Sequence, residues 1–132
     1  MSNSTEAEAA AGVRGAIAAY AHALDDGRTE DVVALFCPDG TSDIAGVGKF
    51  VGRDAIRATY SNMVPTQPQR HMVANTVITS SSEDVATASS DFAFFQRGDA
   101  GWSTLVVGRY EDTLHRRDGD WLFYERLTSY VM

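Results

Sequence analysis

The chain has 132 residues, 44% of them hydrophobic, with 11 basic and 18 acidic residues and a formal net charge of −7, which predicts a single globular domain over residues 1–132 with residues 1–8 frayed. The acidic balance argues against binding to nucleic acid or to an anionic membrane, while the single cysteine excludes an intrachain disulfide and leaves no Cys/His spacing typical of a metal site. Because no run of 18 apolar residues and no signal peptide are visible, we expect a cytoplasmic protein that does not engage a membrane.

The first predicted element is a helix over residues 8–26. Its apolar side chains recur every three or four positions, at Val13, Ile17, Tyr20 and Leu24. This is the spacing of a single helix face. Gly27 then supplies the left-handed residue that commonly ends a helix.

Shorter elements follow the first helix. In chain order they are a helix over residues 30–36, a turn over 38–40, two short strands within 41–52 and a helix over 55–63. Thr29 and Asp54 are the predicted N-caps of these two helices, because their side chains can accept hydrogen bonds from free backbone N–H groups.

The second half of the chain is predicted to be β-structure. Alternating and β-branched runs predict long strands over residues 70–79, 85–97, 102–117 and 121–132. Asp118-Gly119 between the last two is a strong signal for a two-residue hairpin. Helices followed by antiparallel strands are typical of the α+β class. We expect three N-terminal helices packed on a curved antiparallel sheet that forms a cone-shaped barrel, with an apolar pocket suited to a small ligand.

Two carboxylates, Asp25 and Asp26, stand where the first helix ends. Each is disfavoured there by about 0.3–1 kcal/mol, because the C-terminal end of a helix carries partial negative charge. Such a local violation often marks a functional site. At about 100° per residue, Asp25 lies at the edge of the apolar stripe and Asp26 on the solvent side. Only Asp25 is therefore placed to face the interior.

His71, near the start of the strand over 70–79, is the candidate partner of Asp25. Strand alternation places it on one face with Val73, Asn75 and Val77. A carboxylate bonded to one imidazole nitrogen fixes the tautomer and leaves the other nitrogen as a base. The pattern thus suggests that Asp25 orients His71. The alternative is a satisfied core histidine and a solvated aspartate.

Four stretches together resemble the SnoaL-like family of the nuclear-transport-factor-two-like superfamily. They are YAHALDDGRTEDVVALFCPDG (20–40), GVGKFVGRDAI (46–56), RHMVAN (70–75) and VGRYEDTLHRRDGDWLF (107–123). The resemblance runs from about residue 10 to residue 130. It implies a cone-shaped α+β barrel, a dimer or trimer, and no cofactor. Members include scytalone dehydratase, bile-acid dehydratase, a dehydrochlorinase, polyketide cyclases and ketosteroid isomerase.

The resemblance also implies site residues. Several dehydratase-like members pair an aspartate at the end of the first helix with a histidine at the start of a long strand, and Asp25 and His71 match those positions. Tyr20 is similar in position to a pocket tyrosine of bile-acid dehydratase, where the dehydrochlorinase has a lysine. Arg126 resembles an arginine that stabilises a leaving group or oxyanion. The second pocket histidine of scytalone dehydratase is missing, since residues 105–107 are apolar.

Arg126 also has a structural interpretation. Counting back from the predicted hairpin turn pairs Arg126 with Glu111, which predicts a cross-strand ion pair, and Asp112 with Glu125, which predicts a like-charge contact. Asp91 interrupts an apolar strand. It is either a pocket acid or a buried hydrogen-bond acceptor.

Together these residues predict a cofactor-independent, dehydratase-like lyase or isomerase that acts on a small apolar molecule. His71 removes a C–H proton, Asp25 holds and charge-stabilises it, and Tyr20 or Arg126 hydrogen-bonds a leaving oxygen or an enolate. Two alternatives stay open. One is a non-catalytic ligand-binding or subunit-assembly module. The other is an aldol-type polyketide cyclase that uses the same acid–base pair.

Overall fold

The computed structural model describes residues 3–131, with side-chain surroundings from residue 5 onward. In chain order its elements are α1 (Asn3–Asp25), α2 (Thr29–Ala34), β1 (Phe36–Ile44), β2 (Gly48–Val51), α3 (Arg53–Tyr60), a 3₁₀ turn (Ser61–Met63), β3 (Gln69–Ser81), β4 (Val85–Gly98), β5 (Gly101–Arg117) and β6 (Asp120–Tyr130). The order of helices, short hairpin and long strands is the predicted one. α1 begins at Asn3, earlier than predicted, and residues 1–2 of the segment expected to be frayed lie outside the described range.

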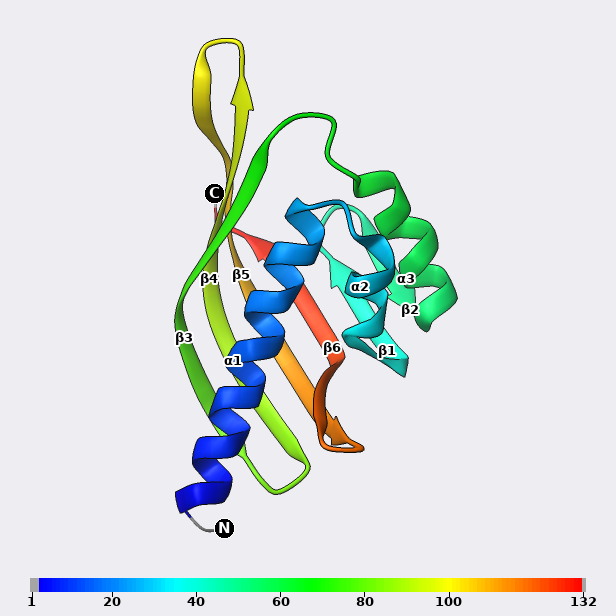
Figure 1. Cartoon of the computed structure of the whole chain (residues 1–132), viewed down its shortest axis with the longest axis vertical. Coiled ribbons are helices and arrows are strands. Elements are labelled where there is room, and N and C mark those ends of the chain that lie inside the picture. The colour runs from blue at the N-terminus through cyan, green and yellow to red at the C-terminus, as the bar shows by residue number, and fades with distance from the viewer. Residues whose placement is uncertain (1–2, 132) are drawn as a thin grey trace.

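The strands form one curved sheet in the order β2-β1-β6-β5-β4-β3. Neighbouring strands run antiparallel, except that β1 and β6 are parallel. α1 crosses one face of this sheet, which we call the inner face, and α2 and α3 lie beside β1 and β2 (Figure 1). The α+β class with N-terminal helices on a curved sheet is confirmed. The sheet is unclosed, because β2 and β3 are its two edges.

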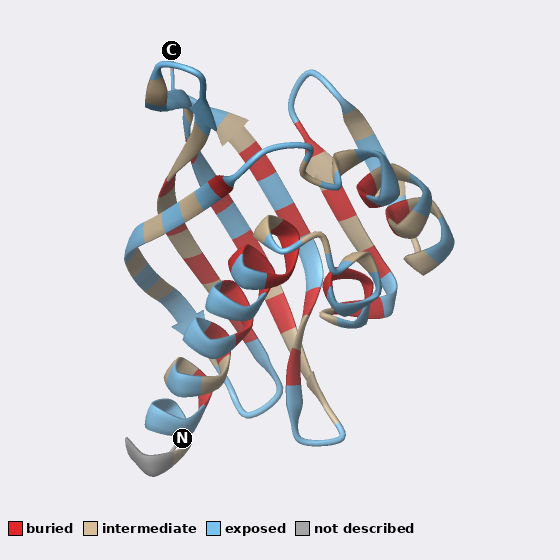
Figure 2. Cartoon of the chain, turned by 45° about the horizontal axis from the view of Figure 1, so that its top comes forward, coloured by how far each residue is buried: buried red, intermediate tan, exposed pale blue. Residues whose placement is uncertain are grey.

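α1 packs on the inner face through the predicted apolar stripe. Val13, Ile17 and Tyr20 are at most 4% exposed, and Figure 2 shows burial along the side of α1 that faces the sheet and exposure along the other side. The close approach depends on Gly12, since a Cβ atom built there would lie 2.2 Å from Cδ1 of Trp121. Gly27, with φ of 71°, follows the helix in the left-handed conformation as predicted.

The predicted caps of the two shorter helices are wrong. The first helical hydrogen bonds are accepted by the carbonyls of Arg28 and Gly52, so these residues are the N-caps. Thr29 and Asp54 lie inside the first turns of α2 and α3. The turn predicted over residues 38–40 is also wrong, because these residues belong to β1, where the pairing with β6 is irregular.

A bulge in β3 overturns the predicted strand face beyond Val73. Asn75 has φ of 56°, and the pairing with β4 is shifted around it. Val77 is therefore 58% exposed on the opposite, outer face, while Val73 and Ile78 both pack against the core. One extra residue in a strand reverses the facing of every residue beyond it.

The hairpin between β5 and β6 has the predicted turn but a different register. Asp118-Gly119 has φ of 53° and 85°, as a two-residue turn of type I′ requires. A second bulge, opposite Thr113 and Leu114, then shifts the pairing by one residue, so Arg126 faces Asp112 and Glu125 faces Thr113. Both pairings counted from the turn, Arg126 with Glu111 and Asp112 with Glu125, are therefore wrong.

Candidate active site

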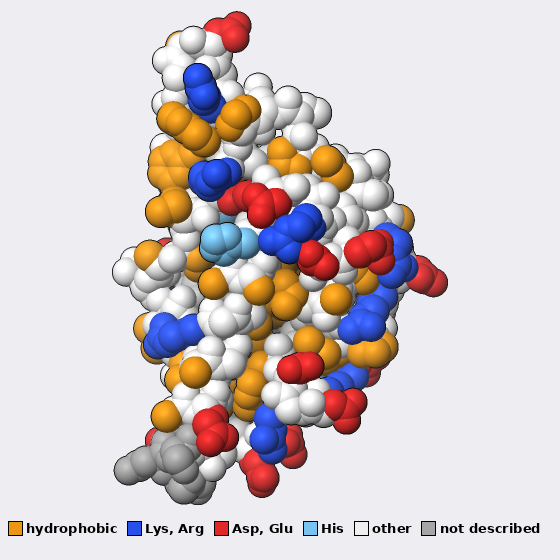
Figure 3. Space-filling model, in the orientation of Figure 1, with side chains coloured by type: hydrophobic (Ala, Val, Ile, Leu, Met, Phe, Trp, Pro, Cys, Tyr) orange, Lys and Arg blue, Asp and Glu red, His pale blue; other side chains and the backbone are white. Residues whose placement is uncertain are grey.

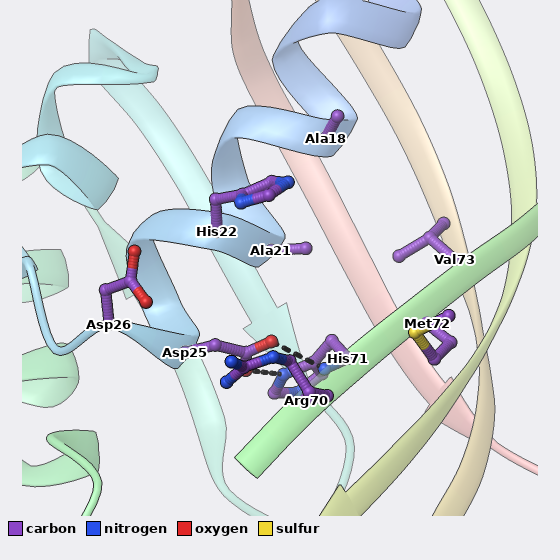
Figure 4. A pocket seen from close by; sticks show the side chains of 9 residues that line it. All are labelled: Ala18, Ala21, His22, Asp25, Asp26, Arg70, His71, Met72 and Val73. Atoms are coloured by element: carbon purple, nitrogen blue, oxygen red, sulfur yellow. Dashed lines mark hydrogen bonds and ion pairs between the residues drawn. The ribbon is translucent and has the colours of Figure 1, made fainter. Parts of the chain in front are cut away.

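Asp25, the last residue of α1, points its carboxylate at the start of β3 (Figure 4). Its Oδ1 lies 2.6 Å from Nδ1 of His71 and accepts a hydrogen bond of 3.1 Å from the Gln69 amide. Its Oδ2 accepts a hydrogen bond of 2.6 Å from the His71 backbone N–H. The side chains of Asp25 and His71 are only 5% and 11% exposed. These partners from β3 compensate the carboxylate for its unfavourable place at a helix C-terminus.

The contacts also set the charge of Asp25. Burial by itself raises the pKa of this carboxyl group, but the hydrogen bonds from the ring and backbone of His71, attraction to His71, and the hydrogen bond from Gln69 outweigh it. The pKa of Asp25 therefore lies below its ordinary value, and the group is ionised at neutral pH.

An ionised Asp25 determines the proton positions on His71. A carboxylate can only accept, so the short contact requires a proton on Nδ1, and in the neutral ring the lone pair is then on Nε2. The imidazole also stacks on Phe94, with ring centroids 4.4 Å apart and 19° between the planes. Hydrogen bond and stacking together hold the ring in one orientation.

Asp26, by contrast, is a surface residue. Its carboxylate is 53% exposed and lies 3.4 Å from the Arg28 guanidinium. Figure 3 shows acidic and basic side chains and a histidine close together on this side of the molecule. The adjacent pair of aspartates thus divides into one buried partner of His71 and one solvated charge.

His71 lines two hollows. One, about 360 Å³, lies beside the end of α1 and is bordered by Ala18, Ala21, His22, Asp25, Asp26, Arg70, His71, Met72 and Val73 (Figure 4). The inner one, about 340 Å³, lies between α1 and the sheet and is bordered by Tyr20, Leu24, Ile44, Val47, Met63, Gln69, His71, Phe92, Phe94, Val106, Tyr110, Thr128 and Tyr130. The inner cavity is more apolar, and none of its bordering residues is Asp, Glu, Lys or Arg. We take it as the candidate substrate site, because ligand sites are mostly apolar with a few placed polar groups.

Tyr20 borders this cavity and heads a buried chain of hydroxyl groups. Its hydroxyl lies 2.6 Å from that of Tyr60, which lies 2.8 Å from the hydroxyl of Ser42. Burial, together with the neighbouring Tyr60 and Tyr110, raises the pKa of Tyr20 well above its ordinary value. Tyr20 is thus a neutral hydroxyl at physiological pH.

Arg126 is fully buried but does not border the cavity. It donates two hydrogen bonds to Asp112, of 2.9 and 3.3 Å. Its guanidinium carbon lies 4.3 Å from the ring centroid of Tyr20 and 3.5 Å from that of Tyr110. The ion pair predicted for Arg126 therefore exists in the core with a different acceptor, and the rings of Tyr20 and Tyr110 separate it from the cavity.

Asp91 takes neither of its two predicted roles. It lies on the outer face, where it accepts hydrogen bonds of 3.0 Å from Asn75 and 3.0 Å from Arg109. These hydrogen bonds lower the pKa of its carboxyl group. Asp91 is a partly exposed ion-pair partner and borders neither hollow.

Sequence reasoning missed Gln69 and Tyr110. Gln69 lies two positions before His71 on the same strand face, which is the signal that could have placed its amide beside Asp25. Tyr110 gave no such signal, because its place against Tyr20 and Arg126 depends on how β5 packs under α1. Within residues 3–131, no group of three or more His, Cys, Asp or Glu side chains gathers as a metal site. Among the described helices, none is long and apolar enough to cross a membrane.

Comparisons with known proteins identify the family and the fold of this chain. The model of the SnoaL-like domain matches residues 5–126. A candidate scytalone dehydratase from Novosphingobium aromaticivorans is 25% identical, with a TM-score of 0.88 over 99% of this chain and 89% of that one. LinA is 20% identical (TM-score 0.87, 100% and 92% covered). The β subunit of a candidate aromatic-ring-hydroxylating dioxygenase, also from N. aromaticivorans, is 21% identical (TM-score 0.80, 92% and 88% covered). No curated protein sequence matches the chain significantly.

Proposed function

The chain belongs to the SnoaL-like family, and on this premise we propose that it is a cofactor-independent, dehydratase-like lyase or isomerase. The observation that carries the proposal is the buried contact between Asp25 and His71 at the wall of an apolar cavity. The similarity to a candidate scytalone dehydratase supports the same class.

His71 acts as the general base in this proposal. Its Nε2 takes a proton from a substrate carbon, and Asp25, bonded to Nδ1, stabilises the imidazolium that forms. In a dehydration, the C–O bond on the neighbouring carbon then breaks, a C=C bond forms, and the leaving oxygen takes up a proton to become water. In an isomerisation, the proton returns to a different carbon. An aldol-type cyclisation uses the same first proton transfer.

Tyr20 and Arg126 serve the leaving oxygen or enolate in different ways. If Ser42 donates to Tyr60 and Tyr60 donates to Tyr20, the Tyr20 hydroxyl proton remains free for the cavity. Arg126 contributes a fixed positive charge beneath the rings of Tyr20 and Tyr110, without touching the substrate.

The lining of the inner cavity suits a small uncharged substrate. Its volume of about 340 Å³ is at the lower end of the range for ligand sites, roughly 300–1,000 Å³. An ionised substrate would lose its hydration there without meeting a charged partner, at a cost of several kcal/mol. The small volume thus favours a molecule of one or two rings, and the lining favours an uncharged one.

The test is a turnover screen with neutral cyclic β-hydroxy ketones, scytalone among them, followed by the absorbance of the unsaturated product. Wild type is expected to turn over at least one of them, and His71→Ala to lose at least about 100-fold of that rate. His22→Ala is the matched control, because His22 is an exposed histidine on α1, the helix that carries Asp25, and its rate is expected to be unchanged. Equal rates for His71→Ala and wild type would rule out the proposed base.

A second candidate function, subunit assembly, is favoured by the outer face of the sheet. Met72 and Val107 flank Ala93 across three paired strands, and the Val131 N–H donates to the Val107 carbonyl, so an apolar row crosses the sheet. Met72, Val107 and Val131 are 61%, 47% and 64% exposed. Exposed apolar rows of this kind mark interfaces.

We propose that a second copy of the chain covers this row. The neighbouring Asp91–Arg109 ion pair supports this occupant, because a two-fold related copy presents the opposite charge to each of these groups. Val107→Glu is expected to convert an oligomer to monomer in size-exclusion chromatography with light scattering. Val51→Glu, on β2 and 61% exposed, is the control that should leave the oligomer intact. A monomeric wild type would exclude this interface.

A further inference from the structure

Tyr110 is a buried residue whose hydroxyl group forms no hydrogen bond within residues 5–131. The residue is only 2% exposed and borders the inner cavity. The other two buried tyrosines near it, Tyr20 and Tyr60, bond to each other. This oxygen is not among the buried side-chain atoms that lack a partner, so it keeps contact with open space, and the residue borders the cavity. A hydroxyl placed in this way can bond to a ligand that enters the cavity.

The ring of Tyr110 is clamped. Phe92 stacks on it with centroids 4.3 Å apart and 17° between the planes. The guanidinium of Arg126 lies 3.5 Å from its centroid. Two groups this close cannot occupy the same ring face, so they cover opposite faces. Tyr20 meets the ring edge-on at 6.0 Å. The hydroxyl is thus held in one position before any ligand arrives, as a preorganised donor must be.

The electrostatics keep this hydroxyl protonated. Burial raises the pKa of Tyr110, and the positive charge of Arg126 offsets only part of that rise. The group therefore offers an O–H donor at neutral pH. Asp112 holds the guanidinium of Arg126 in place. Its positive charge can stabilise negative charge that develops on a ligand oxygen when that oxygen accepts a hydrogen bond from Tyr110.

The aromatic groups form a continuous surface between the base and this donor. Phe94 stacks on His71, the centroids of His71 and Phe92 lie 6.1 Å apart, and Phe92 stacks on Tyr110. Phe92 thus links the base to the ring that carries the free hydroxyl, and a flat ring packed against Phe92 suits this arrangement. The base is on β3 and the donor on β5, and β4, which carries Phe92 and Phe94, lies between these two strands.

We infer that Tyr110 is a hydrogen-bond donor to the substrate, and that the substrate is an uncharged, flat ring compound with a carbonyl or hydroxyl oxygen opposite the carbon that His71 deprotonates. This inference rests on the proposed function and deepens it. Tyr110 acts beside Tyr20, which reaches the same cavity with a hydroxyl that already has a partner.

The experiment measures binding rather than turnover, so that it does not depend on the proposed chemistry. The probes are 1-indanone, its oxygen-free analogue indane, and the anion indane-2-carboxylate, titrated by NMR into wild type, Tyr110→Phe and Tyr124→Phe. Tyr124 is the matched control, because it stacks on His115 outside the cavity. Melting temperatures check that each variant is folded.

Tyr110→Phe is expected to weaken 1-indanone relative to indane by about three- to tenfold, the worth of one hydrogen bond, while indane binds as in wild type. Tyr124→Phe should leave the ratio unchanged. An unchanged ratio in Tyr110→Phe would overturn the inference, as would binding of the carboxylate as tightly as the ketone, or binding of neither neutral probe. If the binding pattern is as expected but no His71 variant loses turnover, only the proposed chemistry is refuted.

Discussion

Replacement of Asp25 by asparagine tests the link between geometry and chemistry most directly. The carboxylate accepts from the His71 ring, the His71 backbone and Gln69 within 2.6–3.1 Å. Asparagine keeps the shape but carries an NH₂ group that donates. Turned toward the ring, this group requires an unprotonated Nδ1, which moves the ring proton to Nε2 and removes the base.

The expected magnitude follows from the contacts. Loss of general-base catalysis costs about 10²–10⁴ in turnover rate, which corresponds to roughly 3–5.5 kcal/mol of activation free energy. Loss of charge-assisted hydrogen bonds to a buried carboxylate costs about 1–3 kcal/mol of unfolding free energy. The fold should survive the change, because domains of this size are stable by about 5–15 kcal/mol.

Two assays check this prediction. Turnover of a screened β-hydroxy ketone gives the rate, and the ¹⁵N chemical shifts of His71 report which ring nitrogen carries the proton. Asp26→Asn is the control, since Asp26 is 53% exposed, and its rate and tautomer should match wild type. The reasoning is refuted if Asp25→Asn keeps a rate within threefold of wild type, or if its His71 tautomer does not change.

Three further predictions concern stability, measured by urea unfolding. In the folded protein the pKa of Asp25 lies below its ordinary value of 3.8, so its contribution to the free energy of unfolding is complete above about pH 5 and is lost as the pH falls below 3.8. The difference in unfolding free energy between wild type and Asp25→Asn should therefore close as the pH falls, and a constant difference would contradict the direction of the pKa shift. Arg126→Ala should cost about 3–5 kcal/mol, because it leaves Asp112 buried and unpaired; a loss below 1 kcal/mol would mean that this pair is not buried as described. Gly12→Ala should destabilise the protein by about 1–3 kcal/mol, because the added methyl group clashes with Trp121. Gly15→Ala, with nothing within 4 Å of the added methyl group, should instead stabilise the protein by up to about 1 kcal/mol. Equal effects of the two substitutions would exclude the close packing of α1.

Several features of the site follow from local sequence patterns. The apolar stripe of α1 defines which side of the helix faces the sheet, and this places Asp25 at the edge of the buried side. Gly27 and Asp118-Gly119 adopt the positive φ values that their residue types favour. These predictions depend on interactions between residues a few positions apart, so the sequence contains the information they need.

The sequence patterns failed where strands change register. The bulge at Asn75 moved Val77 to the outer face, and the bulge in the last hairpin gave Arg126 a different carboxylate partner. Neither bulge has a glycine or proline from which it could have been predicted. A bulge is chosen by how the sheet twists and packs against α1, so it depends on residues from several elements at once.

What the sequence by itself determined was the order of the elements, the α+β class and the separate environments of Asp25 and Asp26. Only the tertiary structure decided that Gln69 and the His71 backbone complete the shell around Asp25, and that Tyr110 lies between Phe92 and Arg126 with its hydroxyl unpaired. The physical reason is range. Helix faces and turns are set by neighbours along the chain, whereas the partners of a buried polar group are set by strands that meet only after the sheet has curved around α1.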